Sequence, residues 1–112
     1  MDANRVVITG MGAITPLGTT PDKFWKHLLE GKSGIGPMTL CDSTDYPCHI
    51  AGEVKNFDPA QYVGTRESRR MARFSQLAVA AALSSVESAH LNMNKEDPYR
   101  VGVVLGNGNG GF

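Results

Sequence analysis

A glycine-rich loop placed directly after an apolar run limits the folds open to this chain. Val101–Leu105 is a short stretch rich in valine, and the four glycines of Gly106–Gly111 follow it at once. Glycine has no Cβ, so such a loop lets the backbone pass close to a neighbouring group. The pattern predicts a buried strand that feeds a close-approach loop. No further element follows to cover the loop, so we expect these 112 residues to be part of something larger.

Composition excludes several classes of protein. The chain is 41% hydrophobic, which suits one small domain, and eleven basic residues balance eleven acidic ones. A balanced charge gives no reason to expect a nucleic-acid partner or a membrane surface. No apolar run approaches the roughly 20 residues that a membrane span needs. The N-terminus lacks the shape of a signal peptide, so the cytoplasm is the default compartment.

The cysteines and histidines show no reactive arrangement on their own. Cys41 and Cys48 are too few for a disulfide framework and have no partners at metal-ligand spacing. Two reduced cysteines in a loop is the favoured interpretation. His27, His49 and His90 have no carboxylate or cysteine at a spacing useful for catalysis or metal binding. We therefore expect no metal site and no cofactor, and the residues by themselves show no reaction.

Local signals predict an α/β order. Arg5–Thr9 is a β-branched run typical of a buried parallel strand. A helix then begins with Thr20 as N-cap and Pro21 in the first position, and Gly31 ends it. With Val101–Leu105 as a second strand, these signals predict helices over a mainly parallel sheet.

The middle of the chain is broken by glycine and proline. Residues 32–62 are expected to form a long loop with one short strand, Ile50–Val54, and one helical turn, Pro59–Tyr62. Residues 66–91 are expected to be the longest helix, capped by Thr65 and buried on more than one side.

Two features of this pattern point to binding. Gly106, Gly108 and Gly111 fit the G-x-G-x-x-G dinucleotide pattern, but no helix or acidic residue follows at the required spacing. Arginines 66, 69, 70 and 73 would lie along one side of the expected helix. They oppose the helix dipole there, which suggests either an anionic partner or ion pairs elsewhere in the fold. Both readings of the arginines stay open on these grounds.

The ordered set of segments resembles the β-ketoacyl-acyl carrier protein synthases over the whole chain. The similarity is greatest to the elongating synthases of type II fatty acid synthesis, and polyketide ketosynthase domains share the same segments. The segments that carry the resemblance are Arg5–Gly18, Phe24–Ile35, Arg69–Gln76 and Gly106–Gly111.

This resemblance implies a thiolase-like fold of five α/β/α/β/α layers, of which residues 1–112 would be an incomplete part of the N-terminal half. It also implies a homodimer and a decarboxylative Claisen condensation of acyl and malonyl thioesters carried by acyl carrier protein. The family's nucleophilic cysteine and two histidines would lie beyond Phe112, so no catalytic residue is expected among these residues and the fragment alone is expected to be inactive. Such a fragment is not expected to bury its own core.

Two sites carry over residue by residue from the resemblance. Arg66, Arg69 and Arg70 match positions that dock the acidic carrier protein. Gly108, Asn109 and Gly110 match the loop that lines the acyl pocket, where the central position is usually apolar and Asn109 departs from the family. A chain-length-factor-like subunit without the cysteine remains open, as does, more remotely, a small nucleotide-binding module.

Overall fold

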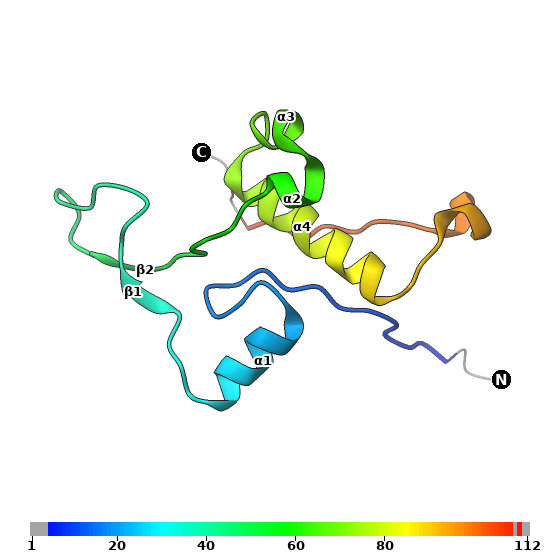
Figure 1. Ribbon diagram of the computed structural model, residues 1–112, viewed down its shortest axis with the longest axis horizontal. Helices are drawn as coiled ribbons and strands as arrows, with labels where there is room; N and C mark the ends of the chain where they lie inside the picture. Colours follow the sequence, from blue (N-terminus) through cyan, green and yellow to red (C-terminus); the bar gives the residue numbers. More distant parts are fainter. Residues whose placement is uncertain (1–4, 109, 111–112) are drawn as a thin grey trace.

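The computed structural model describes residues 5–108 and 110 (Figure 1). Its elements are short and joined by long connections, with the longest helix, α4, at the centre of the molecule. In chain order they are α1 (Pro21–Leu29), β1 (Ile35–Pro37), β2 (Ile50–Gly52), α2 (Ala60–Val63), α3 (Thr65–Ser68), α4 (Arg73–Ser88) and the 3₁₀ turns η1 (Met93–Lys95) and η2 (Pro98–Arg100).

Helix α1 confirms the prediction from its capping residues. The Thr20 hydroxyl accepts the Lys23 amide at 3.3 Å, and proline occupies the first helical position. Gly31 follows the helix with φ of 66°, a left-handed conformation that glycine adopts without strain. The His27 ring Nδ1 lies at hydrogen-bond distance from the Leu17 carbonyl oxygen, which ties α1 to the preceding turn. That contact gives one of the isolated histidines a structural role.

The sheet differs from the expectation. β1 and β2 form a two-stranded antiparallel hairpin, with Ile35 opposite Gly52 and Pro37 opposite Ile50. The predicted strand over Ile50–Val54 is thus shorter at its C-terminal end, and β1 was not predicted. A mainly parallel sheet was wrong for the part of the chain that the structure describes.

The two apolar runs predicted as parallel strands are extended but unpaired. Residues 5–9 and 101–105 are outside any strand, and most of their valine and isoleucine side chains are exposed. Val6 is 90% exposed and Val104 is 99% exposed. Both segments nevertheless run in the same sense along the molecule (Figure 1). The β-branched composition therefore correctly predicts extended backbone, while ladder formation needs partner strands that these residues do not provide.

The predicted long helix is two helices with a break between them. Residues 69–72 leave the helical path, and Ala72 has extended backbone at ψ of 153°. Thr65 begins the short helix α3, so it does not cap α4, whose N-cap is Ala72. The expectation that arginines 66, 69, 70 and 73 share one side of a single helix was therefore wrong.

The closest packing is between α4 and the N-terminal glycine segment. A Cβ added at Gly12 would collide with the Ala81 carbonyl oxygen, and one at Gly10 would collide with the Ser85 carbonyl oxygen and Ala89 amide of α4. Two bonds accompany this crossing: the Met11 amide donates to the Ser88 hydroxyl at 3.4 Å, and the Ser85 hydroxyl donates to the Gly10 carbonyl at 3.5 Å. Small residues on both sides are what permit this approach.

Little apolar surface is buried elsewhere. Ala80 is the one fully buried apolar residue among those described, and no described helix is long and apolar enough to cross a bilayer. The accessible surface is 9349 Å² and the radius of gyration 17.2 Å. A compact chain of this mass exposes about 6,000 Å² and has a radius of about 13 Å. The chain therefore does not bury a core by itself, as the sequence predicts.

Candidate functional site

The break before α4 forms a compact arginine turn, Thr65–Ala72. α3 supplies its first half, and the Arg70 amide then donates to the Glu67 carbonyl at 3.0 Å. The Ser68 hydroxyl donates to the Thr65 carbonyl at 3.0 Å, and Ser68 is only 5% exposed. The backbone of the turn is thus internally bonded, although its arginine side chains point elsewhere.

Gln76 of α4 fixes the arginine turn to the rest of the molecule. Its side-chain amide donates to the Ser68 carbonyl at 2.8 Å and to the Met71 carbonyl at 3.2 Å. The Ser68 carbonyl also accepts the Met71 amide at 3.3 Å, so Gln76 adds a second donor there and supplies a donor to the Met71 carbonyl at the break. The sequence interpretation quoted Gln76 within a motif but gave it no role.

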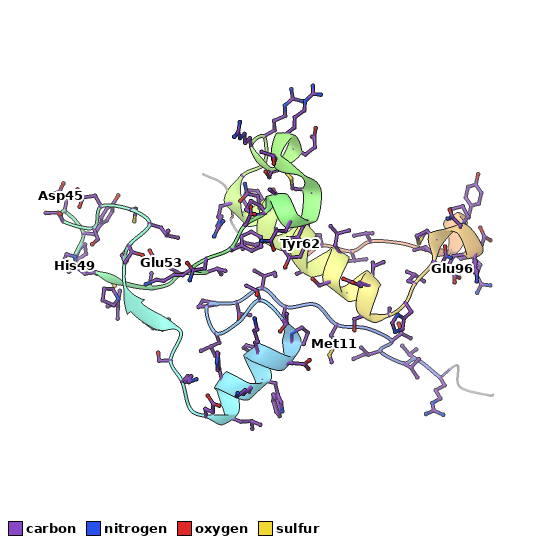
Figure 2. The ribbon with its side chains drawn as sticks, in the orientation of Figure 1. Met11, Asp45, His49, Glu53, Tyr62 and Glu96 are labelled. Atoms are coloured by element: carbon purple, nitrogen blue, oxygen red, sulfur yellow. The ribbon has the colours of Figure 1, made fainter. Side chains whose placement is uncertain are left out.

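Arg66, Arg69 and Arg70 are all exposed. Around α3, long nitrogen-tipped side chains extend away from the body of the molecule (Figure 2). Within the described residues, the ion pairs are Lys32 with Glu30 and Lys55 with Glu53, so none of these three arginines is neutralised by a carboxylate there. Their charges are therefore available to an outside partner.

Arg73, unlike these three arginines, contacts other parts of the chain. Its guanidinium lies 4.8 Å from the centre of the Phe57 ring and donates to the Val54 carbonyl at 3.0 Å. Phe57 also stacks on Tyr62 of α2, with ring centres 5.8 Å apart. Cation–π contact and a hydrogen bond give Arg73 a structural role between α4 and the segment after β2.

The glycine loop crosses the beginning of α4. The Gly110 amide donates to the Asn107 side-chain oxygen at 3.3 Å. A Cβ added at Gly110 would lie 3.2 Å from the Phe74 ring, whereas Gly106 and Gly108 have open space around them. The predicted close approach is thus seen at Gly110 and not at the two earlier glycines. Asn109 and Gly111 lie outside the described residues.

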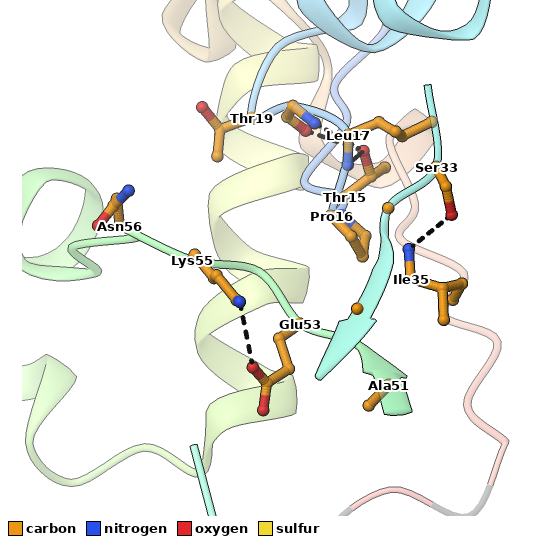
Figure 3. Close-up of a pocket in the computed structure, with 13 residues that line it drawn as sticks. Thr15, Pro16, Leu17, Thr19, Ser33, Ile35, Ala51, Glu53, Lys55 and Asn56 are labelled. Carbon is orange, nitrogen blue, oxygen red and sulfur yellow. Dashed lines mark hydrogen bonds and ion pairs between the residues drawn. The ribbon is translucent and has the colours of Figure 1, made fainter. Parts of the chain in front are cut away.

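A cavity of about 370 Å³ opens beside the hairpin (Figure 3). Its walls come from three segments: the turn at residues 15–19, β1 with the residues before it, and the end of β2 with the residues after it. Within one wall Lys55 Nζ lies 3.9 Å from Glu53 Oε2, and within another the Ser33 hydroxyl accepts the Ile35 amide at 3.1 Å. Its polar groups already bond one another, so it offers no free acid–base pair.

Glu53 faces the loop between β1 and β2. Its carboxylate accepts the Thr39 amide at 2.8 Å, the Thr39 hydroxyl at 2.7 Å and the Leu40 amide at 2.9 Å. The hydrogen bonds from Thr39, then that from Leu40, lower the pKa of Glu53 below its ordinary value. Glu53 therefore acts as an ionised anchor for this loop.

Comparison with known proteins identifies the family. The profile described as "Beta-ketoacyl synthase, N-terminal domain" matches residues 3–112. The chain belongs to the β-ketoacyl synthase family. Within this family it is 43% identical over its full length to 3-oxoacyl-(acyl-carrier-protein) synthase 2 of Synechocystis sp., and 44% identical over 96% of its length to the protein of the same name from Staphylococcus aureus. It spans 27% and 26% of those relatives, about a quarter of each.

A solved structure supports the same family. It is described as "The ishigamide ketosynthase/chain length factor", with a TM-score of 0.72 and 34% identity over 79% of this chain and 22% of that one. The fold class is therefore confirmed: the chain is part of the N-terminal half of a thiolase-like α/β fold. The helices, the short hairpin and the unpaired extended segments together form the part of that fold that these residues contain.

Proposed function

We propose that this chain is the N-terminal part of an elongating β-ketoacyl-acyl carrier protein synthase. The observation that carries the proposal is the family match over residues 3–112, joined to relatives 43–44% identical that are named as synthase 2. The whole protein would condense a malonyl thioester with an acyl thioester in fatty acid elongation. It would act in the cytoplasm, as a homodimer.

The proposed reaction has two stages. The acyl group first moves from its carrier protein to a cysteine thiolate supplied by a later part of the protein. The malonyl thioester then loses CO₂, and the resulting carbanion attacks the acyl thioester to give the 3-oxoacyl product and free the thiolate. The residues of this chain take no part in these covalent steps. Their proposed contribution is to bind the carrier protein and to shape the acyl pocket.

We assign the carrier-protein contact to Arg66, Arg69 and Arg70. Three exposed cations on a hydrogen-bonded turn form a surface that favours an acidic partner. No carboxylate in the described part of the chain lies within ion-pair distance of them. Exposed charge pairs each contribute about 0.2–1 kcal/mol, so three acting together would steer association more than hold the complex. This explains why such a surface suits a carrier protein that must dissociate after each cycle.

We assign the acyl-pocket contact to Gly108, Asn109 and Gly110. Gly110 lies against Phe74, so the loop is held at the beginning of α4. A polar amide at residue 109, in an apolar tunnel, needs hydrogen-bond partners to offset its desolvation. It would shorten the usable pocket or favour an oxygenated chain. Asn109→Ile should shift the product profile toward longer chains, whereas an unchanged profile would contradict this role.

A condensation assay tests the proposed function. The full-length protein that carries this chain is supplied with acyl- and malonyl-carrier protein, and CO₂ and the 3-oxoacyl product are measured. Formation of both in equal amounts supports the proposal, and neither product would contradict it. A protein that needs a second ketosynthase subunit for product formation would instead be a chain-length-factor-like subunit, which the ketosynthase/chain length factor neighbour makes the second candidate.

The same protein also tests the remote nucleotide-binding alternative. We expect no thermal shift with dinucleotide. A saturable shift that disappears when Gly108 is replaced would favour the nucleotide-binding module.

A further inference from the structure

The loop between β1 and β2, residues 38–49, carries both cysteines of the chain. At its base the Met38 amide donates to the His49 carbonyl at 2.9 Å, which extends the hairpin one step beyond the Pro37–Ile50 pair. The next residues on the two arms are Thr39 and Cys48. Cys48 therefore lies at the end of the returning arm, at the base of the loop.

The far end of this hairpin loop reverses the chain. The Tyr46 amide donates to the Ser43 carbonyl at 3.1 Å, and the Asp42 carboxylate accepts the Thr44 amide at 3.0 Å and its hydroxyl at 2.6 Å. The loop is therefore closed by hydrogen bonds at its base and at its far end. Cys41 is on the outgoing arm and Cys48 on the returning arm, and Figure 2 shows Asp45 and His49 in the same small lobe.

Both thiols open onto one cavity. This cavity, of about 540 Å³, is largely apolar, and both cysteines are exposed with free thiols. The Cys48 thiol donates to the Ile50 carbonyl at 3.5 Å. The described residues hold no group of three or more histidine, cysteine or acidic side chains placed to bind a metal, so the shared chemistry is that of two thiols alone. The residues lining the cavity are Met38, Cys41, Asp42, Tyr46, Pro47, Cys48, Ile50 and Ala51.

We propose that Cys41 and Cys48 form a reversible disulfide across the hairpin loop when the protein meets a peroxide. One thiolate attacks the peroxide, the O–O bond breaks, and a sulfenic acid and one water form. The second thiol then attacks that sulfur, the S–S bond forms, and a second water leaves. Two thiols are oxidised, and one hydrogen peroxide is reduced to two waters. The bond would tie the two arms of the loop, and a dithiol reductant would restore both thiols.

Peptide mapping of the full-length protein tests this proposal. No lysine or arginine lies between Lys32 and Lys55, so one tryptic peptide, residues 33–55, carries both cysteines. Hydrogen peroxide should remove two hydrogens from this peptide, block alkylation of both thiols together, and be reversed by dithiothreitol. Oxidation of Met38 adds one oxygen and is not reversed, so the two changes are distinguished by mass.

Single-cysteine variants provide the matched control. In Cys41→Ser or Cys48→Ser the remaining thiol should pass to the sulfenic or sulfinic acid instead of pairing within the peptide. If the native peptide also gives these oxygenated acids, with the two thiols losing reactivity independently, the proposal is wrong. Disulfide-linked dimers through residues 33–55, in place of the intrapeptide bond, would overturn it equally.

Discussion

The glycine crossing at Gly10–Gly12 lies against the C-terminal half of α4, and the arginine turn lies before its first residue. The two regions differ in the groups that they contact. At the crossing, backbone packs on backbone, and any added Cβ would collide with α4. At the arginine turn, the backbone is bonded to itself and to Gln76, but three guanidinium groups have no carboxylate partner in the described residues. The first region is packed within the chain, whereas the second is the surface that we propose binds the carrier protein.

The two regions should therefore respond differently to substitution. A substitution at the crossing should change folding and leave the affinity of the folded protein alone. A substitution of an arginine in the turn should change affinity and leave folding alone. The predictions below test this separation, beginning with the largest expected effect.

Gly12→Val should destabilise the protein most. The new side chain must enter space held by the α4 backbone at Ala81, which cannot move without disrupting the helix. Overpacking of this kind costs about 3 kcal/mol. Chemical denaturation of the full-length protein measures the loss. Thr19→Val, at a position away from the crossing, is the control, and equal loss in both variants would contradict the account of the crossing.

Gln76→Ala should lower the stability of the folded protein by an intermediate amount. It leaves the Ser68 and Met71 carbonyls without side-chain donors, and each lost hydrogen bond costs about 1 kcal/mol. The arginine turn should loosen, so hydrogen exchange should rise over residues 65–72. Carrier-protein affinity should fall as well, because the cations are no longer held together. Gln76→Glu retains the size but not the donor, and full activity in that variant would argue against the proposed bonds.

Arg73→Ala should have a smaller effect on stability and none on carrier binding. It removes the contact with the Phe57 ring and the bond to the Val54 carbonyl. Exposed cation–π contacts contribute about 0.5–1 kcal/mol. Arg73→Lys should recover part of this loss. A drop in carrier affinity equal to that of the Arg69 variant would place Arg73 with the docking group and break the comparison.

Protonation of Glu53 in acid should weaken its hydrogen bonds to the hairpin loop, and this is the smallest of the expected effects on stability. The folded pKa of Glu53 lies below its ordinary value of 4.5, so its contribution is present above pH 4.5 and is lost as the pH falls through the folded pKa. The amide resonances of Thr39 and Leu40 should titrate with a midpoint below 4.5. In Glu53→Gln that titration should vanish. A midpoint above 4.5 would contradict the hydrogen-bonded anchor.

The elements with local signals were predictable from sequence. α1 has its cap, its first-position proline and its terminating glycine within twelve residues, so no distant contact was needed to place it. For the arginines, the residues alone left an anionic partner and ion pairs elsewhere in the fold both open, and the family resemblance favoured docking.

The elements that depend on distant partners were not predictable. The break at residues 69–72 contains neither glycine nor proline, and it is stabilised by the side chain of Gln76 from the next helix. The runs at residues 5–9 and 101–105 have strand composition, but ladders need neighbours. β1 was missed because Ile-Gly-Pro has little strand propensity, and its pairing with β2 decides its conformation.

Carrier-protein binding as a function of salt tests the central claim most directly. Full-length protein and a variant with Arg66, Arg69 and Arg70 replaced by alanine are titrated with acyl carrier protein, beside an Arg100→Ala control on η2. The account predicts that raising salt weakens native binding, and that the triple variant binds at least about tenfold more weakly with little remaining salt dependence. Equal affinity and equal salt dependence in all three proteins would contradict the claim that the arginine turn is the docking surface.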